Sequence, residues 1–493
     1  MSAAKSTAAP STRPEDERLS PGRTIAYGFQ HVLTMYGGII APPLVMGGAA
    51  GMDTAQMGVL VASCLFIGGL ATFLQTLGIP FFGAQLPLVQ GTSFSGVATM
   101  IAILNKDGGM QAVFGATLAS GAIGILLVPF FAKLLRFFPP VVTGTVITII
   151  GMSLFPVTAD WAMGGAGAED YGSLKYIALA AITLLILLAL TKSGVPALAR
   201  LSILLSIVLG TIVAAFMGLT DFSGVLEGDM FAFPTPFAFG PPIFKVGAII
   251  SMMIVILVTY TETTADMLAV AEITGSKVDA RRIANGLRAD MLSSTVAPVF
   301  NTFTQSAFAQ NVGLVAITGV KSRFVVAAGG GILVVLGLLP VLGRVVASIP
   351  VPVLGGAGIV LFGSVAAAGI RTLAKAKDDN MNMVIIATSL AFGSIPMVKP
   401  DFYDQFPDWV GTIFQSSISS ATIMAVLLNI IFNELSFGKK KAISPRTIRK
   451  YQFDALSDGD KVVDGKLFDG QGLEVRVIAE DHGQAGDRPM PPL

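Results

Sequence analysis

The chain has 493 residues, of which 53% are hydrophobic and 13% are charged, and its mean hydropathy is +0.74. No ordinary soluble fold of this size has such a composition, so the sequence indicates a polytopic membrane protein. The formal net charge of +1 gives no electrostatic support for nucleic-acid binding, and the single cysteine, Cys64, excludes an internal disulfide bond.

Both ends of the chain are polar. Residues 1–23 are rich in Ser, Ala and Pro, carry charges of both signs and lack the apolar core of a cleavable signal peptide. We therefore expect a disordered cytoplasmic N-terminal tail. Residues 435–493, which include the run Lys439–Lys441, are expected to form a partly ordered cytoplasmic C-terminal tail. The transmembrane domain is predicted over residues 24–434.

Apolar windows of about 20 residues predict fourteen membrane spans. In chain order they cover residues 24–48, 54–78, 80–104, 111–136, 138–157, 173–191, 197–218, 243–272, 280–300, 302–319, 322–343, 345–370, 380–397 and 410–434. The third and tenth spans are interrupted by polar and small residues.

The positive charges between spans predict the orientation. They concentrate in the loops after even-numbered spans, whereas the opposite loops hold isolated basic residues among more numerous acidic ones. The positive-inside rule then places both termini in the cytoplasm. The basic residues concerned are Lys133, Arg136, Lys192, Arg200, Lys277, Arg281, Arg282, Lys321, Arg323, Arg371, Lys375 and Lys377.

A short pattern occurs twice at a constant offset. Residues 140–144 (PVVTG), with Gly151 further on, match residues 352–356 (PVLGG), with Gly363 further on. The first copy opens the fifth predicted span and the second opens the twelfth. Copies seven spans apart have opposite orientations in the membrane, which is the inverted-repeat architecture of secondary transporters.

The interrupted tenth span is the strongest sign of a functional site. Residues 301–318 (NTFTQSAFAQNVGLVAIT) bring hydroxyls, amides and glycine to membrane depth, where polar groups are tolerated only if buried in protein or lining a cavity. We expect an extended segment at 302–304 and then a helix whose free N–H groups face a ligand. Gln90, Thr92, Ser93 and Phe94 form the corresponding break in the third span.

Three acidic residues lie in or near predicted spans. Glu262 and Asp266 are four positions apart on one helix face within an apolar run, and an ionisable residue there is a functional candidate. For Asp266 a structural hydrogen bond is an equal alternative. Asp290 is a candidate for ion coupling, and an ion pair with Arg288 or Arg282 is its alternative.

Several polar residues are candidates beside these acids. His31, next to Gln30 in the first span, suits proton linkage or a hydrogen-bonded packing role. The amides of Gln310 and Asn311 could pair with the edge of a planar heterocycle, although Asn311 could instead cap the following helix. Phe94 could stack on a flat ring or serve only for packing.

The sequence contains no phosphate-binding loop, no His/Cys metal cluster and no nucleophile elbow. We therefore expect no cofactor and no enzymatic activity. Ion coupling through a membrane carboxylate therefore remains as the energy source for transport, and H⁺ is the expected ion.

Residues 310–319 (QNVGLVAITG) resemble the signature of the nucleobase-ascorbate transporter family, the nucleobase:cation symporters: Gln/Glu/Pro, Asn, any residue, Gly, four variable residues, Thr, then Arg/Lys/Gly. Gln30 and His31, the pair Glu262 and Asp266, and Asp290 add to this resemblance, which covers essentially the whole membrane region.

The resemblance implies an all-α fold of fourteen spans in two inverted repeats of seven, with short β-strands in spans 3 and 10 and usually a homodimer. A core domain would cover about 24–136 and 243–343, and a gate domain about 138–218 and 345–434. The substrate would contact Glu262, Gln310, Phe94, Ser93, Phe308 and Ala309. His31, Asp266, Asp290 and Asn311 would support the geometry or the proton coupling.

Within the family, Gln310 resembles the purine-type members, and the small Ser93 leaves room for an oxidised purine. Residues 312–319 (VGLVAITG) are most similar to bacterial urate and xanthine permeases, which implies a place in the plasma membrane (inner membrane) of a bacterium. The resulting hypothesis is proton-coupled uptake of urate or xanthine by alternating access, with uracil or another nucleobase, or sodium coupling, as alternatives. An anion transporter of the same fold would want a basic residue near the two breaks. An intramembrane enzyme would need an Asp-rich metal motif, for which Asp378 and Asp379 are poor candidates.

Overall fold

The computed structural model describes residues 13–435, except 107, 135–136, 166–167, 227–228 and 377–378, and three strands near the C-terminus. The chain forms two compact units, residues 1–434 and 435–493. In the second unit, β3 (Lys461–Val463), β4 (Lys466–Phe468) and β5 (Glu474–Val475) form an antiparallel sheet. The predicted tail 1–12, the run Lys439–Lys441 and the loop charges Arg136 and Lys377 lie outside the described residues.

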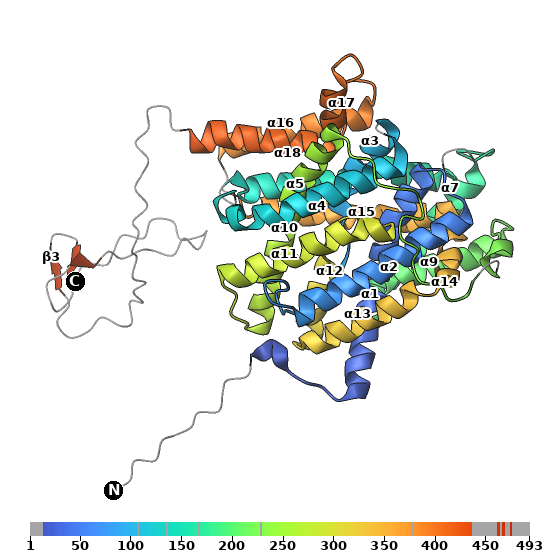
Figure 1. The fold of residues 1–493 in the computed structure, drawn as a ribbon, viewed down its shortest axis with the longest axis horizontal. Helices are drawn as coiled ribbons and strands as arrows, with labels where there is room; N and C mark the ends of the chain where they lie inside the picture. Colours follow the sequence, from blue (N-terminus) through green and yellow to red (C-terminus); the bar gives the residue numbers. More distant parts are fainter. Residues whose placement is uncertain are drawn as a thin grey trace, which may run out of the picture. The chain divides into compact units, whose positions relative to one another are not determined.

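The first unit consists of packed helices (Figure 1). They are α1 (Pro21–Ala49), α2 (Thr54–Leu77), α3 (Val97–Lys106), α4 (Gly109–Leu134), α5 (Pro140–Met152), α6 (Phe155–Ala162), α7 (Leu174–Lys192), α8 (Pro196–Arg200), α9 (Ser202–Phe216), α10 (Val246–Thr274), α11 (Ala280–Val296), α12 (Ala309–Thr318), α13 (Arg323–Gly337), α14 (Pro340–Ala347), α15 (Val351–Leu373), α16 (Asn380–Val398), α17 (Asp408–Phe414) and α18 (Ser417–Asn429). Short helical turns are η1 (Pro14–Asp16), η2 (Phe94–Gly96), η4 (Ser223–Leu226), η5 (Ala297–Phe300) and η6 (Ile430–Glu434). Its two strands in the described residues are β1 (Gln90–Thr92) and β2 (Gln305–Ala307).

Many of these helices are long and apolar enough to cross a membrane. Within the described ranges nine helices meet this condition. Helices α13 and α14 are bent by 79° relative to each other, and if they are counted together as one span the number becomes ten. Three further apolar helices are shorter, with 10–17 residues. The twelfth predicted span, 345–370, is displaced: α15 begins only at Val351, because α14 occupies residues 340–347 and Pro350 precedes the new helix.

Helices α5 and α15 pack with their backbones in close contact. A Cβ atom on Gly144 would lie 2.7 Å from the Leu373 nitrogen, and one on Gly151 would lie 2.3 Å from the Ala366 nitrogen. The contact continues into α6, where a Cβ on Gly355 of α15 would lie 2.4 Å from the nitrogen of Ala162, the last residue of α6. Because the contact positions increase along one helix as they decrease along the other, α5 and α15 run antiparallel. Only glycine permits this approach.

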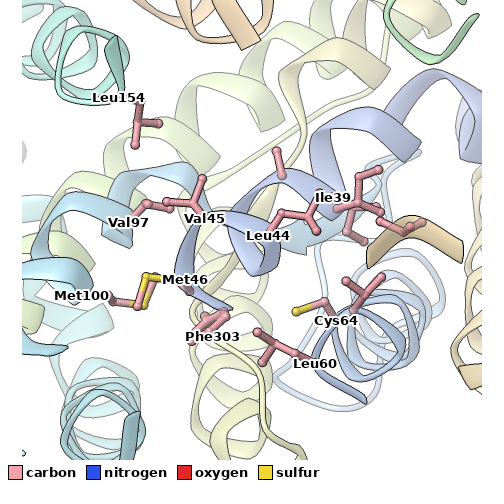
Figure 2. Packing of buried hydrophobic residues seen from close by; sticks show 14 of the residues in the cluster. Ile39, Leu44, Val45, Met46, Leu60, Cys64, Val97, Met100, Leu154 and Phe303 are labelled. Atoms are coloured by element: carbon pink, nitrogen blue, oxygen red, sulfur yellow. The ribbon is translucent and has the colours of Figure 1, made fainter. Parts of the chain in front are cut away.

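Buried apolar side chains surround the two strands. Figure 2 shows Phe303, just before β2, among Met46 of α1, Leu60 and Cys64 of α2, and Met100 of α3. The Cys64 thiol is buried, as expected for a packing residue, and its sulfur lies 2.9 Å from the Thr302 hydroxyl. Because lipid is as apolar as these side chains, their close van der Waals packing, and not removal from water, holds the interrupted segments in place.

The predicted disorder of residues 1–23 is wrong for residues 13–23. Residues 14–16 form η1, and α1 already begins at Pro21. The Glu15 carboxylate is fully buried and accepts hydrogen bonds from the Arg282 guanidinium, at 2.5 Å, and from the Ser276 hydroxyl. Asp16 pairs with Arg323 at 2.6 Å. These ion pairs fix the segment against the ends of α10, α11 and α13, which composition alone does not reveal.

We expect Glu15→Gln to lower the free energy of unfolding by about 2 kcal/mol at neutral pH, because it removes a charged hydrogen bond to Arg282. Burial by itself raises the pKa of Glu15, but the bonds from Ser276 and Arg282 outweigh it and lower the pKa below its ordinary value. A carboxylate with a lowered pKa contributes stability above its unfolded-state pKa of about 4.3 and loses it as the pH falls through the folded-state value.

The difference between the wild type and Glu15→Gln, measured as thermal unfolding of the purified protein, should therefore shrink as the pH falls below about 4. Glu17→Gln, at an exposed position two residues away, is the matched control and should change little. Equal melting of all three proteins at neutral pH would contradict a stabilising role for η1.

Candidate functional site

The two interrupted segments meet as an antiparallel pair of strands. Gln90 is paired with Ala307, Gly91 with Ser306 and Thr92 with Gln305. One further backbone hydrogen bond extends the pair at each end: the Ser93 N–H donates to the Thr304 carbonyl at 2.8 Å, and the Phe308 N–H donates to the Val89 carbonyl at 3.0 Å. After each strand the chain turns helical, into η2 and α3 on one side and into α12 on the other. Free N–H groups of both helix starts therefore lie beside the strand pair.

Aromatic side chains cover this junction. The Phe308 ring lies between Gly38 of α1 and Gly91 of β1, where an added Cβ would approach the ring to 2.9 and 2.7 Å. The Phe94 and Phe308 ring centroids are 6.4 Å apart. Phe94 also makes an edge contact with Phe362 of α15 at 5.8 Å, and Phe362 lies 6.3 Å from Trp161 of α6. Phe94 therefore connects the strand pair with α15.

Glu262 on α10 reaches the start of the third segment. The Ser95 hydroxyl of η2 donates to the Glu262 carboxylate at 2.5 Å, and the Ser93 hydroxyl accepts the Ser95 N–H at 3.2 Å. Asp266, one turn further along α10, is half-buried and within electrostatic range of Glu262. The sequence left a structural hydrogen bond as an equal alternative for Asp266. Within the described residues, its carboxylate makes neither a hydrogen bond nor an ion pair. The carboxyl of Glu262 is thus held at the strand ends.

Asp290 on α11 is buried and bound by neutral groups. Its carboxylate accepts from the Gln75 amide at 3.0 Å and from the Thr263 hydroxyl at 2.7 Å. The alternative of an ion pair with Arg288 or Arg282 is wrong. The Arg288 guanidinium bonds to Asn285, and that of Arg282 bonds to Glu15 and to backbone carbonyls. Since Thr263 follows Glu262, Asp290 fixes the turn of α10 that carries Glu262.

His31 and Asn311 form a buried pair that joins α1 to α12. The Asn311 amide donates to the His31 carbonyl at 3.1 Å and lies 3.0 Å from the His31 ring nitrogen Nδ1. The side chain of Asn311 does not cap α12, and Phe308, the residue before the first turn of this helix, makes no side-chain capping hydrogen bond either. The interpretation of His31 as a hydrogen-bonded residue in helix packing thus agrees with its contacts.

Gln310 and Ala309 lie on an exposed face at the start of α12. Gln310 lines a cavity of about 40 Å³ between α1, α8, α9 and α15, which has room for a few water molecules. No hydrogen bond joins Gln310 to Glu262 in the described part of the chain. The structure thus brings together Glu262 with the third segment and Asn311 with His31, while Gln310 faces the boundary with α9 and α15.

Sequence reasoning missed four residues at this site: Ser95, Thr263, Gln75 and Phe362. Ser95 follows the candidate Phe94 along the chain, and Thr263 follows the candidate Glu262. A polar side chain directly beside a candidate residue could therefore have identified both. Gln75 and Phe362 lie in apolar runs of other helices, where nothing in the sequence distinguishes them from packing residues. Among the described residues, no group of three or more His, Cys, Asp or Glu side chains is placed to hold a metal ion.

Two substitutions at Asp290 should separate hydrogen bonding from charge. Asn can still accept from Gln75 and donate to Thr263. Leu removes the acceptor of the buried Thr263 hydroxyl and leaves the Gln75 amide with only its longer bond, 3.4 Å to the Gly286 carbonyl. We expect Asp290→Leu to lower the free energy of unfolding by about 2–4 kcal/mol and Asp290→Asn to cost about 1 kcal/mol or less. Thermal unfolding of the purified variants checks this, and equal losses would show that the negative charge itself is required.

Apolar helices long enough to span a membrane, two interrupted segments paired by short strands and a carboxylate held at their ends define a membrane transport protein. The Xan_ur_permease model, described as a permease family, matches residues 22–402. The chain belongs to this permease family, the nucleobase-ascorbate transporters, and is a transporter rather than an enzyme.

Its similar relatives include the uric acid transporter UacT of Escherichia coli, 40% identical over 85% of this chain and 89% of the relative. The xanthine permease of Bacillus subtilis is 40% identical over 85% of this chain and 96% of the relative. The uric acid permease PucK of the same species is 39% identical over 82% and 94%. Among solved structures, the transmembrane domain of the cyanobacterial bicarbonate transporter BicA aligns with a TM-score of 0.57 at 15% identity, over 83% of this chain and 99% of that one. SLC26A9 aligns with a TM-score of 0.57 at 13% identity, over 84% and 66%. These two structures share the fold.

Proposed function

We propose that this protein is a symporter that imports a purine base, urate or xanthine or both, together with a proton. The names of relatives that are 39–40% identical over more than four-fifths of the chain support the substrate class. The observation that carries the proposal is the hydrogen bond from Ser95 to Glu262. It holds a carboxyl group, which can take up and release a proton, beside two helix starts that offer free N–H donors.

The architecture that we propose has fourteen spans in two inverted repeats. The long apolar helices, the bent pair α13 and α14, the three shorter apolar helices and the polar α11 supply these spans. Corresponding elements of the two repeats run antiparallel in two places, as expected if the repeats are inverted. Strands β1 and β2 come from spans 3 and 10, and helices α5 and α15 come from spans 5 and 12. The core would comprise 24–136 and 243–343, and the gate 138–218 and 345–434.

In this proposal Glu262 and Gln310 bind the polar edge of the purine, and Phe94 and Phe308 contact its faces. Ser93 and Ala309 line the site at the two strand ends. His31 and Asn311 keep α12 in position, while Asp266 and Asp290 support Glu262. The coupling ion is H⁺, the protein is a homodimer, and both termini lie in the cytoplasm.

Binding requires the site to open. The 40 Å³ cavity beside Gln310 is too small for a bicyclic base, and Phe94 is in contact with Phe362 of the proposed gate. Movement of α15 away from Phe94 would create the space between the faces of the core and the gate. The backbone contact between α5 and α15 would keep these two gate helices together during that movement.

Coupling follows from linkage at one carboxyl group. If the purine binds more tightly when Glu262 is protonated, protonation and binding favour each other by the same free energy. The proton and the substrate then cross the membrane together. Sodium coupling is the alternative, and it requires uptake to depend on the sodium gradient at constant pH.

Thermal stabilisation of the purified protein by urate, xanthine, hypoxanthine, uracil and sulfate, each at several pH values, tests the proposal. We expect stabilisation by urate or xanthine that changes with pH. Stabilisation by uracil alone would contradict the assignment of a purine, and stabilisation by sulfate alone would favour an anion transporter. Uptake of the radiolabelled purine into proteoliposomes, with a pH gradient or a sodium gradient, then identifies the coupling ion.

A further inference from the structure

A positively charged side chain lines the cavity beside Gln310. Arg200, the last residue of α8, lines it together with Thr34 of α1 and Ser364 of α15. Arg200 is half-buried, and in the described part of the chain its guanidinium has neither a hydrogen bond nor an ion pair with another residue. It is also the only ionisable residue among those that line this cavity.

A cation without a counter-charge produces a positive potential in its surroundings. The potential is strongest where protein replaces water, because the dielectric constant is lower there than in bulk solvent. The other cavity residues are apolar or uncharged, and so none of them cancels the charge. An anion that approaches Gln310 from this side is therefore stabilised relative to a neutral molecule of the same shape.

The two purines of the proposed function differ in charge. Uric acid is a monoanion at neutral and mildly acid pH, whereas xanthine is largely neutral in mild acid and becomes anionic in mild alkali. We propose that Arg200 determines specificity by favouring the anionic form of an oxidised purine at the Gln310 side of the site. This inference rests on the proposed function and adds the ionisation state of the substrate.

The position of Arg200 beside Gln310 was not predictable from the sequence. Arg200 counted only as one of many basic loop residues, and a basic residue near the breaks was expected solely for an anion transporter. The fold brings Arg200 from α8 to the start of α12, although the two are far apart along the chain. The positive charge thus comes from the proposed gate, and Gln310 from the proposed core.

Equilibrium binding of radiolabelled urate and xanthine, at mildly acid and mildly alkaline pH, tests the inference with Arg200→Gln and Arg200→Lys. We expect Arg200→Gln to weaken urate binding about tenfold at both pH values, as for unit charges roughly 10 Å apart in a partly buried site. Xanthine binding should weaken only in mild alkali. Arg200→Lys keeps the charge and should retain most of the urate affinity.

Lys192→Gln is the matched control, because Lys192 is an exposed basic residue just before α8 and does not line the cavity. It should change neither ligand's affinity. Comparing urate with xanthine at the same pH removes effects of Glu262, which both ligands share. In the wild type, added salt should weaken urate binding more than binding of neutral xanthine, and this measurement does not depend on whether a variant folds.

The possible failures are distinguishable. If the wild type binds neither purine, the proposed function is wrong. If the wild type binds urate or xanthine but Arg200→Gln leaves urate binding unchanged, or weakens urate and neutral xanthine equally, the function stands and the role of Arg200 is refuted. Equal salt sensitivity of the two ligands in the wild type would refute it as well.

Discussion

Glu262→Gln is expected to abolish proton-coupled uptake, with a loss of about 100-fold or more, while binding of urate, whose charge is constant from mildly acid to neutral pH, persists and no longer depends on pH. The Gln side chain has the size of the protonated carboxyl group, and its carbonyl oxygen can still accept from the Ser95 hydroxyl. It cannot release a proton, so the step that returns the empty carrier with a deprotonated site is lost. Binding and uptake measured over the same pH range check both parts.

Glu272→Gln is the matched control for this experiment. Glu272 lies on the same helix, α10, but is exposed and remote from the strand pair along the chain. It should leave both binding and uptake close to wild type. An unchanged pH dependence of urate binding in Glu262→Gln would exclude Glu262 as the coupling group, and the coupling role would then pass to Asp266 or Asp290.

Gly151→Ala is expected to destabilise the protein by about 3 kcal/mol or more, whereas Gly363→Ala should be neutral or stabilising by up to about 1 kcal/mol. A Cβ on Gly151 would lie 2.3 Å from the Ala366 nitrogen and 2.7 Å from the Phe362 carbonyl oxygen, and neither backbone atom can move aside without separating α5 from α15. Gly363 has nothing within 4 Å, so alanine adds only its better helix propensity.

These two glycines occupy equivalent positions in the repeated sequence pattern, which makes them a matched pair. The melting midpoints of the purified variants, measured under identical conditions, should move in opposite directions or differ by several degrees. Equal midpoints would show that α5 and α15 can separate at little cost. Loss of purine uptake in Gly151→Ala at a temperature where it remains folded would connect this contact with transport.

Much of the architecture was predictable because hydrophobic burial leaves a direct record in the sequence. Long apolar runs predicted the spans, and most helix bounds agree to within a few residues. The shift of the twelfth span to Val351 came from a local competition that hydropathy does not register: α14 takes the preceding residues. Polar α11, with buried Asp290, was also placed correctly at residue 280, although its composition is poorly suited to a lipid-facing helix.

The site was less predictable because its contacts join residues that are distant along the chain. Glu262 stood out as a carboxyl in an apolar run, but its partner Ser95 comes from another segment. Gln75, which binds Asp290, lies in the last turn of α2, a largely apolar helix. From the sequence, the nearby arginines were candidate partners for Asp290. In the structure one of them, Arg282, bonds to Glu15 instead. Local spacing thus identified the candidate residues but not their partners.

The aromatic contact between Trp161 and Phe362 gives the molecule an intrinsic optical probe of its own site. Trp161 is one of two tryptophans in the chain, and its neighbour Phe362 touches Phe94 beside the paired strands. Any displacement of α15 that uncovers Phe94 also changes the surroundings of the Trp161 indole, and hence its emission. In a Trp409→Phe background, stopped-flow fluorescence would therefore follow opening and closing of the site in real time, without an attached dye.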